Sequence, residues 1–258
     1  MPTDELLAPM TQAVESVAAT LLRAVLPPPS RTWAEFSAAF DGIDCPATDQ
    51  LRTMLDSAVP GVAWLGDPAA ADAEGWFADV TDGAVQYLQG LPHWCVTLSY
   101  VRGGRAEATV IHSATRAETY VATRGGGARL NGQSIQPSQK SDLGVCIAAT
   151  NQPPFINRQP AAITEAARSL AKMLPIVGAV RNFGPTSLQI ADTAAGRVDI
   201  FWEYGRDEEN LLGAELIAQE AGLAVSDAHG EAWTANSASF LAVPKPLRDD
   251  VITALAAA

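Results

Sequence analysis

Two aspartates spaced three residues apart, Asp79 and Asp82, are the residues of this sequence best suited to chemistry. They end a short apolar strand pattern and directly precede Gly83, which lets the backbone turn tightly or approach a ligand. Carboxylate oxygens held at a turn are typical Mg²⁺ ligands, and the short helical pattern that follows would bring a helix N-terminus, which suits a phosphate. Asp-x-x-Asp-Gly is also a common composition of acidic surface turns. The spacing alone therefore leaves a metal–phosphate site and a plain surface turn open.

The same pair could also work without a metal. Two carboxylates held close together repel, so one of them could keep a proton near neutrality. Such a pair can serve as acid and base.

Composition limits the fold and the partners. The 258 residues, 48% of them hydrophobic, suffice for one large globular unit or two smaller ones sharing a core. The net charge of −12 predicts that neither nucleic acid nor an anionic membrane surface is a partner. A phosphorylated small-molecule substrate stays open, because a bound cation can reverse the local field.

Cysteine usage and hydropathy predict a cytoplasmic protein. Cys45, Cys95 and Cys146 are widely spaced and make no C-x-x-C pair, which is typical of reduced thiols. The N-terminus lacks the basic region of a signal peptide, and no unbroken apolar run approaches the ~18 residues of a membrane span. We therefore expect no targeting segment and no membrane helix.

The elements that must position the aspartates follow from periodicity. In the first half, helical spacing alternates with strand-like runs, of which the last three are joined by turns into an antiparallel meander. The expected helices are Thr3 to Val25, Trp33 to Phe40 and Thr48 to Val59, with a loop from Asp41 to Ala47; the expected strands are Gly61 to Leu65, Cys95 to Val101, Ala106 to His112 and Thr119 to Ala122.

The second half alternates strands and helices from Val145 onward. We expect two halves, residues 1–142 and 143–258, packed as one unit with the site between them. An antiparallel meander in one half and an α/β alternation in the other predict layered helices and sheets, an α/β (α+β) fold.

Several segments in order resemble the inositol monophosphatase family of Mg²⁺-dependent small-molecule phosphatases. The family's central motif, Asp-Pro-Ile-Asp-Gly-Thr-x-Asn-Phe, is similar to the run from Asp79 to Tyr87. Further matches are Ala47 to Gln50, Gly125 to Ser138, Arg181 to Thr186, Ala195 to Asp199, and Glu220 to Gly222. The resemblance implies a five-layer αβαβα sandwich, a cytoplasmic location, a homodimer and a small-molecule substrate.

The resemblance also implies a mechanism, in which two or three Mg²⁺ ions polarise a phosphate ester and activate a water. The metal ligands carried over are Asp79, Asp82 and the backbone carbonyl of Thr81. The family's ligand Glu, in Gly-Glu-Glu, maps onto Asp67, an acid one methylene shorter. Asp67, Asp79 and Asp82 are thus the catalytic and metal-binding candidates if a metal binds.

Other positions depart from the family in one direction. The second Glu of Gly-Glu-Glu maps onto Pro68, the late-helix Asp ligand onto Asn210, and the Thr that orients the water onto Ala84. Each change removes an anionic or polar group from the metal–water site. Magnesium is therefore possible but doubtful, and no other cofactor is expected.

Acids near the altered positions could compensate. Asp72 and Glu74 follow Asp67, and Asp207 precedes Asn210 with Glu208 and Glu209. An exposed loop and a solvated helix start are the commoner arrangement for such acids. The substrate side looks better kept, and its candidates are Gly83, Ala84, Gly184, Thr186, Glu203 and Asn210.

Three functions stay open on the sequence. The first is an inositol-monophosphatase-like protein for a polyol, sugar or nucleotide-type ligand, with Mg²⁺-dependent hydrolysis weakened or lost. The second is a repurposed enzyme, an isomerase, lyase or cyclase, that uses the pocket carboxylates without metal. The third is a non-catalytic protein that binds a ligand or a partner.

Overall fold

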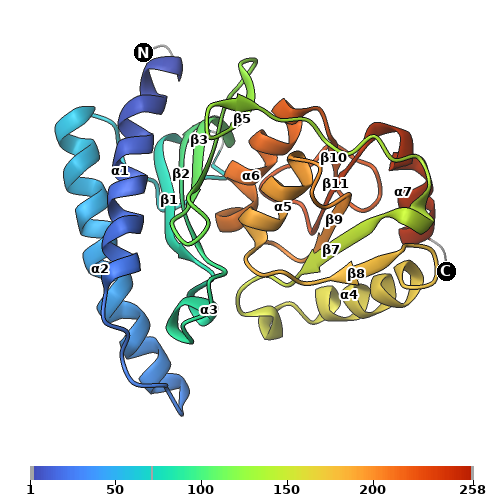
Figure 1. Ribbon diagram of the computed structural model, residues 1–258, viewed down its shortest axis with the longest axis horizontal. Helices are drawn as coiled ribbons and strands as arrows, with labels where there is room; N and C mark the ends of the chain where they lie inside the picture. The colour runs from blue at the N-terminus through green and yellow to red at the C-terminus, as the bar shows by residue number, and fades with distance from the viewer. Residues whose placement is uncertain (1–2, 71, 257–258) are drawn as a thin grey trace.

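The structure, a computed structural model, describes residues 3–70 and 72–256. Helices and sheets alternate in five layers, so the predicted αβαβα sandwich is confirmed (Figure 1). The first layer is the antiparallel pair α1 (Thr3–Arg23) and α2 (Trp33–Ala58). Buried Leu6, Met10 and Val14 on α1 recur at helical spacing and pack α1 against the first sheet.

The first sheet is a six-stranded antiparallel meander in sequence order. Its second face is covered by α6 and α5, which form the middle layer (Figure 1). The strands are β1 (Glu74–Asp82), β2 (Cys95–Arg102), β3 (Arg105–Ser113), β4 (Glu118–Thr123), β5 (Gly127–Leu130) and β6 (Gln133–Ser134), with helix α3 (Ala84–Leu88) between β1 and β2.

The second sheet has the order β10-β11-β9-β7-β8, in which β7 is parallel to β8 and β9 and the other pairs are antiparallel. Helices α4 and α7 form the fifth layer (Figure 1). The bounds are β7 (Ile147–Asn151), α4 (Pro160–Met173), β8 (Ala179–Arg181), α5 (Thr186–Ala194), β9 (Ile200–Tyr204), α6 (Glu208–Ala221), β10 (Ala224–Ser226), β11 (Ser239–Val243) and α7 (Arg248–Ala256), with short 3₁₀ turns at Leu143–Val145, Ile156–Arg158 and Lys245–Leu247.

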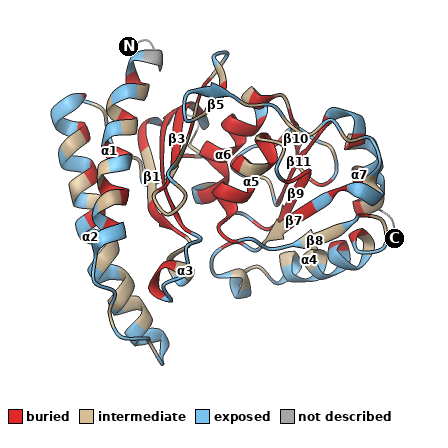
Figure 2. Cartoon of the chain, in the orientation of Figure 1, coloured by how far each residue is buried: buried red, intermediate tan, exposed pale blue. Residues whose placement is uncertain are grey.

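Helix α6 lies between the two sheets and is buried along most of its length (Figure 2). Gly213 makes this close approach possible, because a Cβ there would lie 2.5 Å from Ser99 Oγ and 2.6 Å from Thr109 Oγ1. Both hydroxyls belong to the first sheet. The N-terminus of α6 is thereby held deep between the sheets, where the candidate site residues lie.

The expected loop from Asp41 to Ala47 is wrong, because α2 is one helix from Trp33 to Ala58 with Pro46 inside it. A proline removes one helical hydrogen bond, in this helix to the carbonyl of Gly42. Gly42 is exposed, so water can satisfy that carbonyl. The apolar stripe of Phe36, Phe40, Ile43, Ala47, Leu51 and Leu55 continues across the proline without a change of phase.

The expected strand from Gly61 to Leu65 is also wrong. The segment makes only an isolated parallel bridge between Trp64 and Trp76. Two hydrogen bonds support it, from Leu65 N–H to the Trp76 carbonyl (2.9 Å) and from Trp76 N–H to the Ala63 carbonyl (2.7 Å). The turn that follows carries the chain away before a strand can extend.

The sequence also predicts that the chain has no membrane-spanning helix. No helix in the described ranges is long and apolar enough to cross a membrane. The division at residue 142, the cytoplasmic location and the homodimer stay predictions.

Candidate functional site

A β-bulge at the end of β1 brings the two motif aspartates together. Asp79 lies opposite Thr97, whereas Asp82 lies opposite Cys95, so β1 has one more residue than β2 between these pairs. Residues three apart in a regular strand point to opposite faces, and the inserted residue reverses that phase. Gly83 follows with φ +93°, and a Cβ there would lie 2.7 Å from the His93 carbonyl oxygen.

Asp82 is buried against the middle layer. Its Oδ2 accepts the Ser187 backbone N–H (3.1 Å) at the start of α5 and lies 3.6 Å from the Cys95 thiol. Burial raises the pKa of Asp82 to about 6, although the bonds from Ser187 oppose the rise. The N-terminus of α5 therefore binds a carboxylate of the protein itself.

Asp79 is half-buried, and its Oδ1 accepts the Thr81 N–H (2.9 Å). Its pKa is raised well above the usual value, first by burial and then by the negative charges of Asp82, Asp44 and Glu209. The two motif aspartates thus share a site in which protonation is favoured.

Sequence reasoning missed Asp44, which comes from α2. The Thr81 hydroxyl donates a hydrogen bond to Asp44 Oδ1, and burial raises the pKa of Asp44. The pKa of Glu209, in the first turn of α6, is raised first by desolvation and then by the charges of Glu208 and Asp44. Asp44 stands within the apolar helical pattern of α2, and this pattern could have indicated that its side chain is partly buried. The expected loop from Asp41 to Ala47 concealed the pattern.

The second half contributes Glu203, the last but one residue of β9. Glu203 is fully buried, and its Oε2 accepts the Thr186 hydroxyl (3.1 Å), which in turn accepts Asn151 Nδ2 (2.7 Å). Burial raises the pKa of Glu203 to about 7. Its Oε1 has no hydrogen-bond partner among the described residues; an ionised carboxylate oxygen can only accept, so a partner would have to be a donor.

Asp207, just before α6, is buried at 4% exposure, so the expectation of a solvated acid there is wrong. Burial raises its pKa well above the usual value. A side-chain hydrogen bond links Asp207 and Glu203, and it lowers the pKa of Glu203 and raises that of Asp207 further. One proton shared between the two carboxyl groups would satisfy both of the oxygens that face each other. Asp207 Oδ1 also accepts Asn210 Nδ2 (2.8 Å).

Asn210 takes part in the same cluster through its amide. It is 6% exposed, and its Oδ1 is unpartnered within the part of the chain that the structure describes. The Ser187 hydroxyl donates to the Asn210 backbone carbonyl (3.0 Å). Beyond the effect of burial, the charge of Asp82 raises the pKa of both Glu203 and Asp207. The two halves therefore meet in one polar cluster.

Of the remaining predicted residues, Ala84 and Gly184 lie close in sequence to residues of this cluster, whereas Asp67 lies at the other end of the first sheet. Ala84 begins α3 directly after Gly83, and Gly184, with φ +65°, lies two residues before Thr186, where a Cβ would lie 2.5 Å from Gln86 Nε2. Asp67 is exposed, and its Oδ1 accepts the Ala69 N–H of its own turn (2.9 Å). The Ala69 carbonyl in turn faces Gly104 in the β2–β3 hairpin, at the end of the sheet away from the motif aspartates.

The acids considered as replacements for Asp67 do not contact the motif aspartates. Asp72 is exposed. Glu74, at the start of β1, accepts the Tyr100 hydroxyl (2.6 Å) and Arg102 Nε (3.2 Å). Glu74 therefore has an ordinary surface role.

The side chains present do not fit the family's set of two or three Mg²⁺ ions. Residues 3–70 and 72–256 contain no group of three or more His, Cys, Asp or Glu side chains arranged to hold a metal ion. Asp207 is turned to Glu203, and Asn210 offers a neutral oxygen in place of a carboxylate. Mg²⁺ requires near-octahedral oxygen ligands at short range, which Asp79 and Asp82 alone do not supply.

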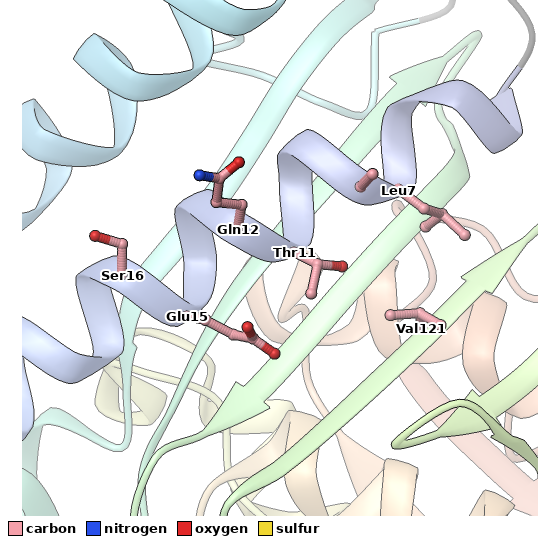
Figure 3. A pocket seen from close by; sticks show the side chains of 7 residues that line it. Leu7, Thr11, Gln12, Glu15, Ser16 and Val121 are labelled. Atoms are coloured by element: carbon pink, nitrogen blue, oxygen red, sulfur yellow. The ribbon is translucent and has the colours of Figure 1, made fainter.

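A groove elsewhere on the surface offers no comparable chemistry. The groove has a volume of about 650 Å³ and lies between α1 and β4. Figure 3 shows the side chains that line it. The groove lies on the face of the first sheet opposite α6, and its acid, Glu15, accepts the Thr119 hydroxyl (2.8 Å). The polar cluster between the sheets is therefore the candidate site.

Comparison with known proteins agrees with this fold. The Nus factor SuhB of Pseudomonas aeruginosa is 31% identical over 195 residues, covering 73% of this chain and 72% of that protein. The Nus factor SuhB of Escherichia coli is 37% identical over 155 residues, covering 60% of this chain and 57% of that protein. The crystal structure of the extragenic suppressor protein suhB from Bartonella henselae matches with a TM-score of 0.84 at 25% identity, over 98% of each chain.

These names correct one expectation. Relatives designated Nus factors conflict with the exclusion of nucleic-acid partners that we drew from the net charge, and that exclusion is wrong. The physical reason is that a whole-chain charge does not describe the local fields of separate surfaces.

The family is settled by the length of the match. Residues 43–258 match the model of the inositol monophosphatase family. This range includes every candidate site residue and both sheets. The chain belongs to the inositol monophosphatase family.

Proposed function

We propose that this chain binds a small polyol or sugar-like ligand between its two sheets, and that Mg²⁺-dependent hydrolysis of phosphate monoesters is weakened or lost. The observation that carries the proposal is the buried Asn210 Oδ1, which lacks a protein partner among the described residues and lies in the same cluster as the carboxyl groups of Glu203 and Asp207. Buried polar atoms are normally hydrogen-bonded. A ligand hydroxyl group would supply the missing donor.

The proton shared by Glu203 and Asp207 extends this proposal to chemistry. A carboxylic acid beside a carboxylate, with a pKa near neutrality, can give a proton to one ligand atom and accept one from another. Isomerisation, elimination and cyclisation of a hydroxylated ligand are reactions of this kind. They require none of the ligands that the metal site lacks.

One incubation tests both parts. With Mg²⁺ and a panel of sugar, polyol and nucleotide phosphates, we expect the wild-type protein to release no more phosphate than an Asp79→Asn/Asp82→Asn double variant. In D₂O without added metal, we expect deuterium to enter the carbon next to the carbonyl group of one of the unphosphorylated reducing sugars, as followed by NMR, and the Glu203→Gln variant to abolish this exchange. Phosphate release well above the double variant would restore the phosphatase function.

A second candidate function rests on the relatives. Two of them, at 31% and 37% identity, bear the name Nus factor, and a role of that kind would need a surface and not the polar site. Expression in an Escherichia coli strain without its own SuhB tests it. Restored growth by both the wild type and Glu203→Gln would favour this role, whereas no restoration would remove it.

A further inference from the structure

We propose that the ligand of this site carries a protonated amine, so that the protein binds an aminocyclitol or amino sugar in which an ammonium group takes the place of the family's metal ions. This inference rests on the proposed function, because it names the class of polyol that the site accepts. It follows from the charges around the site, from the kind of atom left unpartnered, and from the poor fit to Mg²⁺.

The first argument is the absence of positive charge. Six carboxyl groups gather at the site from α2, β1, β9 and the start of α6. Within residues 3–70 and 72–256, none of them forms an ion pair with Arg, Lys or His. The six carboxyl groups are those of Asp44, Asp79, Asp82, Glu203, Asp207 and Glu209.

Other acids in the interior of the same chain lie close to cations, which makes this arrangement distinctive. Asp192 is held by Arg116 (2.6 Å) and Asp199 by Lys140 (2.7 Å). Even Glu215, whose pKa burial raises to about 7, has the opposing charges of two arginines nearby. Buried carboxylates are normally compensated in this way. The site carboxylates are therefore suited to a cation from outside the chain.

The second argument is the kind of orphaned atom. Glu203 Oε1, Asp207 Oδ2 and Asn210 Oδ1 are all oxygens, and they lack partners among the described residues. One shared proton satisfies the first two, which leaves the Asn210 oxygen as an acceptor. A phosphate dianion brings only acceptors and more negative charge, whereas hydroxyl and ammonium groups bring donors.

The third argument separates an ammonium group from Mg²⁺. The ion needs several oxygens at about 2.0–2.1 Å in octahedral geometry, and the described carboxylates do not form such a group. An ammonium group has three donors and bonds oxygens at ordinary hydrogen-bond lengths. Asp79 and Asp82, with Asp44 and Glu209 nearby, can accept hydrogen bonds of ordinary length from an ammonium group without meeting the octahedral geometry that Mg²⁺ needs.

Matched ligand pairs test the inference by isothermal titration calorimetry. Each pair differs only in an amine for a hydroxyl: glucosamine and glucose, galactosamine and galactose, mannosamine and mannose, scyllo-inosamine and scyllo-inositol. At a pH at which the amines are protonated, we expect at least one amine to bind about tenfold or more tightly than its neutral partner. Asp79→Asn should remove that preference, whereas Asp249→Asn, which neutralises an exposed acid on α7, should retain it.

The outcomes distinguish this inference from the proposed function. Binding of neutral members with equal or greater affinity would overturn the amine inference and leave the polyol site intact. Tighter binding of glucose 6-phosphate with Mg²⁺ than of any amine would overturn both. Thermal unfolding of Asp79→Asn checks that the variant folds, and Asp44→Asn, which removes a charge beside the motif, gives a second measurement of the same preference.

Discussion

Glu203→Gln is expected to make this protein more stable at about pH 8, by roughly 3 kcal/mol, and to change its stability little at about pH 5. The folded-state pKa of Glu203 is raised from 4.5 to about 7, because the carboxylate is buried without a cation. For an acid with a raised pKa, the unfolded chain releases its proton first. Stability is therefore fully present below 4.5 and is lost as the pH rises from there through about 7.

Thermal unfolding at the two pH values measures this effect. For a chain of this length, roughly 3 kcal/mol corresponds to a rise of about 6–12 °C in Tm. Glu118→Gln is the control, because the Glu118 side chain is also largely buried, at 16% exposure, but is paired with Arg197 (2.8 Å). It should lower Tm. A Glu203→Gln variant with a wild-type Tm at about pH 8 would contradict the uncompensated buried charge.

Asn210→Asp is expected to destabilise the protein by about 3 kcal/mol near pH 8 in the absence of Mg²⁺. The change removes the amide donor that bonds Asp207 Oδ1 (2.8 Å) and adds a carboxylate beside Glu203, Asp207 and Asp82. Combined with Ala84→Thr, it also restores two of the family's groups. Millimolar Mg²⁺ should therefore raise the Tm of this double variant and leave that of the wild type unchanged.

The control for added charge is Asn236→Asp, where the new carboxylate lies beside Arg206 on the surface (2.7 Å from the present amide oxygen). Its stability should stay within about 0.5 kcal/mol of wild type. Phosphate release by the double variant, but not by the wild type, would mean that the natural site has lost hydrolysis. An equal response of both proteins to Mg²⁺ would contradict the poor fit of the natural site to metal.

The fold was readily predicted because its signals are local and ordered along the chain. Helical spacing on α1, the turn-linked strands from Cys95 onward and the alternation after Val145 each required only neighbouring residues. The error at α2 lay in ending the first helical segment at Phe40, whereas the helix continues through Pro46 to Ala58. A proline is tolerated inside a helix when the carbonyl that loses its hydrogen bond is exposed to water and a continuous apolar face packs the helix against the protein.

The site was less predictable because burial depends on distant layers. Asp79, Asp82 and Glu203 could be named from motif resemblance, and the structure brings them into one cluster. Asp207 precedes a helix in a run of acids, which locally indicates a solvated start. Its burial follows from the insertion of α6 between two sheets, permitted by Gly213.

The position of α6 in the chain also matters while the protein is being synthesised. The six strands of the first sheet are complete by Ser134, but the helices that cover their second face, α5 and α6, begin only at Thr186 and Glu208. A nascent or truncated chain that ends between these points exposes one apolar face of a finished sheet, which favours aggregation. Premature termination in this interval should therefore yield fragments that depend on chaperones, even though every strand of that sheet is present.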